Sequence, residues 1–307
     1  MNDPAHDRES IGEVRNPLGI DGIEFVEYAT SRPQALGQVL EMMGFRPVAR
    51  HRSREVLLYR QGPMNVVINA HVGAATAADA AASAPGARGA APGEAPVIAA
   101  VALRVRDAAA AYRHALERGA WGVPAQVAVM ELNIPAIHGV GMSRIYFVDR
   151  YREFSIYDVD FVPIPTVEHA PPALAGLHWF GLVQYIGDGR MEDWTEFYRE
   201  LFAFDVLPDE QRFGILPKGR ILRSPCQSFY WQLIEPDPGN LDVDADERLA
   251  RVGLGAPDVP AAVRALRARG VEFVEAASLH SDARGALTRT QLGGATFELV
   301  HDGRGTP

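Results

Sequence analysis

The chain has 307 residues, of which 47% are hydrophobic, so it is long enough to bury a large core, and its length predicts two domains. Its formal net charge of −9, without a long basic run, predicts that it binds neither nucleic acid nor a membrane surface. Cys226 is the single cysteine, which excludes a disulfide framework and a thiolate metal cluster.

The N-terminal part of the chain predicts a polar leader followed by a first structural module. Residues 1–16 are polar and lack the apolar stretch of a secretion signal, so we expect them to be disordered and the protein to be cytoplasmic. The run Ile20–Tyr28 favours a strand, and apolar residues at helical spacing over Gln34–Met43 predict a helix. Short strands are predicted at Glu55–Arg60 and Met64–Asn69, so this module has the order βαβββ.

The same order of elements recurs three more times. Residues 73–96 consist mainly of Ala, Gly, Ser and Pro, and we expect a flexible loop because they bury too few apolar side chains to offset the entropy of ordering. Each later module has a first strand, a helix and further strands, as follows: Val97–Val105, Asp107–Arg118 and Glu131–Phe161; Trp179–Ile186, Met191–Phe202 and strands to Ile234; Leu249–Leu254, Val259–Arg269 and strands to Val300. The sequence therefore predicts four modules in two domains, residues 17–163 and 173–301.

Two internal similarities show which modules correspond. Residues 105–119 parallel residues 256–270, which relates the second module to the fourth. Residues 40–45 parallel residues 199–204, which relates the first module to the third. The boundary between the two pairs is expected near residues 163–172, which are rich in proline.

Three stretches of the second module carry a family resemblance: Met130–Gly139, Ile145–Arg150 and Ser155–Phe161. Together they resemble the first half of 4-hydroxyphenylpyruvate dioxygenase, a non-haem iron enzyme of the vicinal oxygen chelate superfamily. The resemblance extends over about residues 17–300 and implies an α+β fold, in which four βαβββ modules form two open-barrel domains. It also implies Fe(II)-dependent oxidative decarboxylation and hydroxylation of an aromatic 2-oxo acid in tyrosine catabolism. Met130–Gly139 lies in the half without metal, so we interpret it as structural or as a subunit contact.

The resemblance implies an iron site in the second domain, held by two His residues and one Glu. Glu298 in the last strand matches the family's carboxylate ligand. His178 resembles the first His, whereas an alignment without an insertion places Gly181 there. Arg251 stands where the family has its second His, and a guanidinium has no lone pair to give to iron.

The neighbouring polar residues predict an altered site. We expect Arg251 and Glu298 to approach to salt-bridge distance inside the C-terminal barrel, because the resemblance brings both positions to one metal. The alternative is that Arg251 points to solvent. Ser224, Gln232 and Arg251 are the candidate substrate-binding residues, and His178 and Glu298 are the candidate metal ligands.

Three hypotheses for function follow. The first is the family activity with Fe(II). The second is a protein without a metal cofactor that binds a small aromatic 2-oxo acid, with Arg251 holding its carboxylate. The third is a non-catalytic partner subunit that pairs through its N-terminal half with an active relative. We also expect the protein to form a homo-oligomer. Nucleotide binding and serine hydrolase chemistry are not predicted, because the chain has neither a glycine-rich phosphate loop after a strand nor a G-x-S-x-G motif. We expect no stoichiometric iron and no homogentisate formation.

Overall fold

A computed structural model describes residues 16–70, 95–124, 132–152, 154–215, 219–235, 247–276, 279–301 and 303. The expected disorder of residues 1–16 and of the 73–96 loop lies outside these residues, apart from positions 16, 95 and 96, and stays a prediction. Met130 and Glu131 of the family motif also lie outside them.

The N-terminal half forms an eight-stranded sheet with the order β6-β7-β5-β1-β4-β3-β2-β8. Its elements are β1 (Gly22–Ala29), α1 (Pro33–Met42), β2 (Arg46–His51), β3 (Val56–Gln61), β4 (Met64–Asn69), β5 (Val97–Arg104), α3 (Ala108–Glu117), β6 (Ala136–His138), the 3₁₀ turn η1 (Val140–Met142), β7 (Arg144–Val148), α4 (Ile156–Asp160) and β8 (Phe161–Pro163).

The C-terminal half forms a seven-stranded sheet with the order β10-β11-β12-β9-β13-β15-β14. Its elements are the 3₁₀ turn η2 (Leu174–Gly176), β9 (His178–Tyr185), α5 (Met191–Phe202), β10 (Asp205–Val206), β11 (Arg220–Arg223), β12 (Tyr230–Ile234), β13 (Arg248–Gly255), α6 (Val259–Arg267), β14 (Gly285–Leu287) and β15 (Phe297–Val300).

Strand pairing confirms the predicted modules and the α+β fold class. In every module the first strand pairs in parallel with the last main strand: β1 with β4, β5 with β7, β9 with β12, and β13 with β15. Antiparallel pairing of β1 with β5, and of β9 with β13, then joins two modules into each curved sheet. The helices begin as the parallel between modules two and four suggests, because Asp107 and Asp258 each cap a helix through the backbone N–H three residues later.

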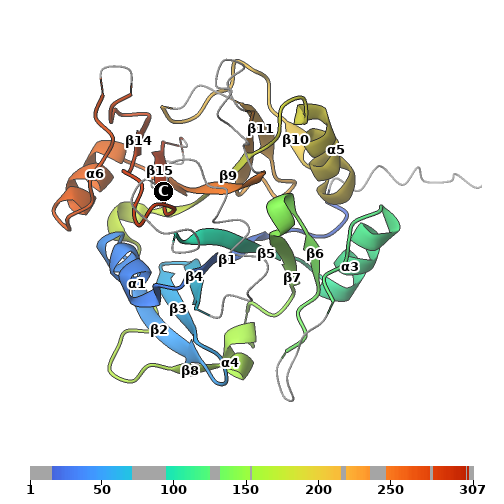
Figure 1. Ribbon diagram of the computed structural model, residues 1–307, viewed down its shortest axis with the longest axis horizontal. Helices are drawn as coiled ribbons and strands as arrows, with labels where there is room; N and C mark the ends of the chain where they lie inside the picture. The colour runs from blue at the N-terminus through green and yellow to red at the C-terminus, as the bar shows by residue number, and fades with distance from the viewer. Residues whose placement is uncertain are drawn as a thin grey trace, which may run out of the picture.

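The two halves pack directly on each other, with β1 and β9 near the middle of the molecule (Figure 1). One hydrophobic core includes residues of both sheets and of α1, α3, α5 and α6. Across the junction, the rings of Phe147 on β7 and Phe202 on α5 have centroids 6.3 Å apart. Arg269, just after α6, donates to the carbonyl oxygens of Met42 and Glu41 at the end of α1, at 3.0 and 2.7 Å.

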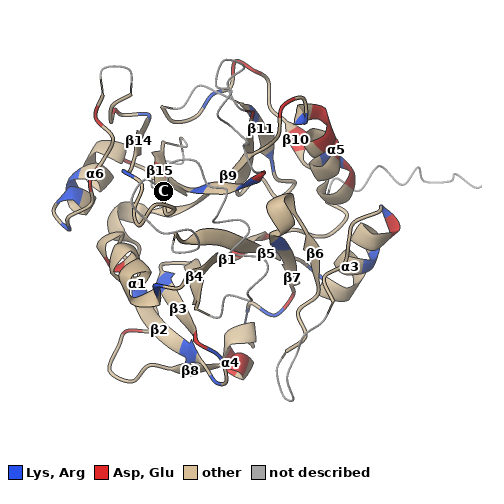
Figure 2. Ribbon diagram, viewed as in Figure 1, with Lys and Arg blue, Asp and Glu red and all other residues tan. Residues whose placement is uncertain are grey.

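Charged residues lie mainly on the helices and loops, and acidic ones gather on α5 (Figure 2). Glu192 and Asp193 stand in the first turn of α5, where negative charge is favoured by the helix dipole. Among the described helices, none has both the length and the apolar composition that crossing a bilayer requires.

Candidate functional site

The central strands of the C-terminal sheet bring the predicted site positions together. In the antiparallel pair of β9 and β13, Gly181 lies opposite Gly253, and Val183 lies opposite Arg251. Strand β15 runs along the other side of β13 and places Glu298 beside Gly253. Positions 181, 251 and 298 therefore meet on one part of the sheet, although they are far apart in sequence.

Arg251 and Glu298 form a buried ion pair, as predicted. Arg251 Nε lies 3.8 Å from Glu298 Oε2, and the two side chains are 10% and 5% exposed. Arg251 Nη1 donates to the hydroxyl of Tyr185 at 2.8 Å. Its Nε and Nη2 are buried and have no hydrogen-bond partner within the described ranges. The guanidinium thus keeps hydrogen-bonding capacity that neither Glu298 nor Tyr185 uses.

The Glu298 carboxyl group is unusually basic. Burial raises its pKa from 4.5 to about 7, and the positive charge of Arg251 opposes only part of this rise. Near neutral pH the group is therefore partly protonated, and the ion pair is only partly formed.

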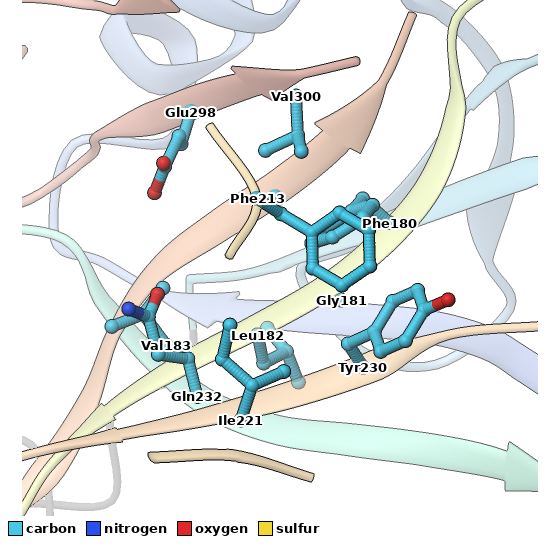
Figure 3. Close-up of a pocket in the computed structure, with 11 residues that line it drawn as sticks. Phe180, Gly181, Leu182, Val183, Phe213, Ile221, Tyr230, Gln232, Glu298 and Val300 are labelled. Carbon is cyan, nitrogen blue, oxygen red and sulfur yellow. The ribbon is translucent and has the colours of Figure 1, made fainter. Parts of the chain in front are cut away.

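The cavity beside Glu298 is small, at about 20 Å³. Figure 3 shows Glu298 and Gln232 on one side of it, and an aromatic cluster of Phe180, Phe213 and Tyr230 on the other. The ring centroids in this cluster lie 4.8 to 5.3 Å apart. This volume is enough for about one water molecule.

Phe213 belongs to an irregular segment that lies against the carboxylate of Glu298. A Cβ atom added to the next residue, Gly214, would stand 2.6 Å from Glu298 Oε1. The segment therefore approaches Glu298 as closely as a glycine allows. The sequence did not identify this segment, because it lies between β10 and β11 and has no periodic pattern. Tyr230, in contrast, could have been found, because it shares a strand face with Gln232 two positions later.

His178 lies at the beginning of β9, opposite Gly255. Its ring covers Gly255, and its Nδ1 is 3.1 Å from the carbonyl oxygen of Gly176. A register shift around Phe180 interrupts the strand alternation, so sequence parity does not decide which face His178 shares. His178 is not among the residues that line the cavity of Glu298, and its role as a ligand stays a prediction.

The other two candidate residues have different surroundings. Gln232 lines the cavity. Ser224 is fully buried in the turn between β11 and β12, where its Oγ accepts from the backbone N–H of Phe229 at 3.3 Å and lies 3.3 Å from Cys226 Sγ. Ser224 does not line this cavity, and its contacts are those of a turn residue.

The described side chains do not fit Fe(II). An iron site of the facial type takes two imidazoles and one carboxylate. No three His, Cys, Asp or Glu side chains are grouped in metal-binding arrangement within the described ranges. Glu298 supplies one carboxylate, and the nearest charged group is a guanidinium, which donates no lone pair.

Comparison with known proteins identifies the relatives of this chain. Residues 14–162 match the family described as hydroxyphenylpyruvate dioxygenase, N-terminal. Hemolysin VllY of Vibrio vulnificus is 34% identical over 289 residues, which cover 87% of this chain and 75% of that protein. The 4-hydroxyphenylpyruvate dioxygenase of Pseudomonas aeruginosa is 33% identical over 280 residues, 85% of this chain and 73% of the other. A mutant of 4-hydroxymandelate synthase from Streptomyces coelicolor has a similar fold, with a TM-score of 0.70 at 17% identity and coverage of 94% of each chain.

Proposed function

The chain belongs to the 4-hydroxyphenylpyruvate dioxygenase family, and from this membership we propose that it is a binding protein that has lost the family's iron-dependent oxidation. The buried pair of Arg251 and Glu298 carries this proposal. It puts a permanent positive charge beside Glu298, the one carboxylate that the described residues bring to this cavity.

The residues at the three family positions support the loss of iron. β15 provides Glu298, β13 provides Arg251, and β9 provides either Gly181 or His178. Iron would have to bind with at most two protein ligands and against the repulsion of a guanidinium. Each 1.4 kcal/mol lost in this way weakens iron binding about tenfold.

The size of the cavity supports the same proposal. An aromatic 2-oxo acid that reaches Glu298 needs far more room than about 20 Å³. Phe213 packs against Tyr230 at this cavity, so it would have to move before a substrate could enter.

Iron loading tests the proposal directly. The purified protein is incubated with Fe(II) without oxygen, desalted, and analysed for metal, and oxygen uptake is then followed with 4-hydroxyphenylpyruvate and ascorbate. We expect no stoichiometric iron and no homogentisate. The Pseudomonas aeruginosa relative, treated identically, serves as the positive control. Steady oxygen uptake that needs both Fe(II) and the 2-oxo acid, and that Glu298→Ala abolishes, would refute the proposal.

A second candidate function is binding of a small aromatic 2-oxo acid, without metal, in the C-terminal barrel, which requires the same movement of Phe213. The Nε and Nη2 of Arg251, which have no hydrogen-bond partner among the described residues, favour it, because a carboxylate can accept two hydrogen bonds from one guanidinium. Calorimetry with phenylpyruvate tests it. Binding by the parent protein that Arg251→Met removes, and that the exposed control Arg264→Met retains, would support this function. Absence of heat in the parent protein would refute it.

We also propose that the protein self-associates, because a binding subunit can act within an assembly. Trp121 is 74% exposed, and its carbonyl oxygen accepts from the backbone N–H of His138 in the family motif. An exposed indole beside this motif supports its interpretation as a subunit contact. Light scattering is expected to give a multiple of the chain mass that Trp121→Ala reduces, whereas a monomeric parent protein would contradict the expectation.

A further inference from the structure

The N-terminal barrel contains a much larger cavity than the site in the other half. Its volume is about 590 Å³, within the range of about 300–1,000 Å³ that is typical of small-molecule sites. Strand β5 crosses the middle of the sheet and places two small, almost completely buried residues, Ala100 and Ala102, between the neighbouring strands β1 and β7.

The strand register arranges side chains of β1 and β7 in two rows, one on either side of Ala100 and one on either side of Ala102. In one row, Glu27 of β1 is paired with Ala100, which is paired with Arg144 of β7. In the next row, Phe25 is paired with Ala102, which is paired with Tyr146. Each row therefore has one functional side chain on either side of an alanine. All four outer side chains line the cavity.

The row of Glu27, Ala100 and Arg144 carries opposite charges at its two ends. Glu27 is 8% exposed, and its Oε1 accepts from Asn69 Nδ2 at 2.9 Å. Burial raises the pKa of Glu27, against the opposing charges of Arg144 and Arg54. Arg144 donates through Nη1 to the hydroxyl of Tyr146 at 3.3 Å. Within the described ranges, Glu27 and Arg144 form no ion pair with each other, although each senses the other's charge. Ala100 thus lies in the sheet between a buried carboxyl group and a guanidinium.

The other row provides apolar contact. The rings of Phe25 and Tyr146 have centroids 5.9 Å apart and planes inclined by 46°. Val67 and Ile156 add aliphatic walls. His138, at the same cavity, has a buried Nδ1 for which the described residues offer no hydrogen-bond partner. The cavity therefore combines an aromatic wall, the opposite charges of Glu27 and Arg144 (with Arg54 and Asp160 also in its lining), and an unsatisfied polar atom.

We propose that the N-terminal barrel binds a small aromatic α-amino acid, with its ammonium group at Glu27, its carboxylate at Arg144 and its ring against Phe25 and Tyr146. A zwitterion fits the charged row because it neutralises both side chains at once. An acid without the amino group would add no positive charge beside Glu27, and an amine without the carboxylate would add no negative charge beside Arg144, so each would leave one of the two buried groups without a direct ionic partner. This inference is independent of iron loss in the other barrel.

Calorimetry on the full chain tests the proposal with L-phenylalanine and L-tyrosine as probes. The analogues 3-phenylpropionate, which lacks the ammonium group, and phenethylamine, which lacks the carboxylate, are measured in parallel. We expect the amino acids to bind and each analogue to bind roughly tenfold more weakly or worse, as the loss of one charge-assisted hydrogen bond predicts. Equal binding of all four compounds, or binding of none, would overturn the proposal.

Variants then locate the binding site. Glu27→Gln and Arg144→Met should each weaken the Kd by about tenfold or more, and Arg144→Lys should restore part of the loss. Ala102→Leu should block binding of the ring, because the larger side chain would displace Phe25 and Tyr146, with which Ala102 is paired. The melting curve of this variant shows whether it is folded. The exposed pair Glu117→Gln and Arg113→Met on α3 are matched controls that should bind like the parent protein. Binding that survives Ala102→Leu in a folded variant, or that Arg251→Met removes instead, would place the ligand elsewhere and refute the proposal.

Discussion

Glu298 is held in surroundings that favour its neutral form. It has 3% of its surface exposed, and among the described residues the guanidinium of Arg251 lies 3.8 Å away. The effect of burial outweighs the attraction of Arg251, and the pKa of Glu298 rises to about 7.

The raised pKa makes stability depend on pH in a defined direction. The folded protein keeps the Glu298 proton up to about pH 7, whereas the unfolded chain releases it near 4.5. The folded state binds more protons in this window, so the free energy of unfolding falls as the pH rises through it. Glu298→Gln removes this loss of stability, because a glutamine side chain does not titrate. Relative to the parent, the variant should gain about 3 kcal/mol between pH 4.5 and 8, measured by urea unfolding. A constant difference across this range would contradict the prediction.

Arg251→Met should show the complementary effect. Arg251 lowers the pKa of Glu298, so its removal raises that pKa further and extends the unfavourable window above pH 7. The substitution should therefore cost more stability at about pH 9 than at about pH 5, where Glu298 is protonated in both proteins. Arg248→Met on the same strand is the control, and its cost should not depend on pH in this way. Equal costs at both values would show that the pair does not govern this titration.

Strand β9 explains why the site is closed. A Cβ atom on Gly181 would collide with the backbone carbonyl of Tyr230 on the neighbouring strand β12. The two strands approach so closely that this position accepts only glycine. If Gly181 occupies the position of the first family ligand, a histidine could return there only if β12 moved.

Gly181→Ala should therefore destabilise the protein. The added methyl group meets backbone rather than a flexible side chain, and overpacking of this kind costs about 1–3 kcal/mol. Gly253→Ala is the matched control, because this glycine is paired with Gly181 and its new methyl group would mainly meet the movable ring of Phe180 at 3.2 Å. Chemical unfolding should rank Gly181→Ala well below Gly253→Ala. The reverse order would show that β12 can move away.

Local sequence patterns predicted the helices and strands better than they predicted which residues contact one another. The modules followed from periodicity and from the internal parallels, and the approach of Arg251 to Glu298 followed from the family resemblance. The register shift at Phe180, the position of Phe213 and the large N-terminal cavity were not predicted. Each depends on which strands become neighbours, and residues such as Glu27 and Arg144 give no sequence signal that they line the same cavity.

On the scale of the molecule, the two halves share one hydrophobic core rather than meeting through a polar interface. Phe147 is fully buried and contacts Phe202 of the other half. Arg269 adds hydrogen bonds to the carbonyl end of α1, where positive charge is favourable. Halves joined in this way should unfold together.

Phe147→Ala tests this coupling, because the substitution lies in the N-terminal half and three of the four tryptophans lie in the other. In a Trp121→Phe background, fluorescence reports only on Trp179, Trp194 and Trp231. The loss of a buried phenylalanine costs about 3–5 kcal/mol, and we expect the fluorescence transition to shift by this full amount. An unchanged transition, or two separate calorimetric peaks, would show that the halves unfold independently.

The turn between β11 and β12 has a practical consequence for spectroscopy. Cys226 is the only thiol of the chain, is partly exposed, and lies within hydrogen-bonding distance of Ser224 and Ser228. Ser228 in turn lies close to Gly22 at the start of β1, so this turn borders the N-terminal half. A maleimide dye or nitroxide would therefore attach at a single place in the unmodified protein. Such a label would follow relative movement of the two barrels when a ligand enters either of them.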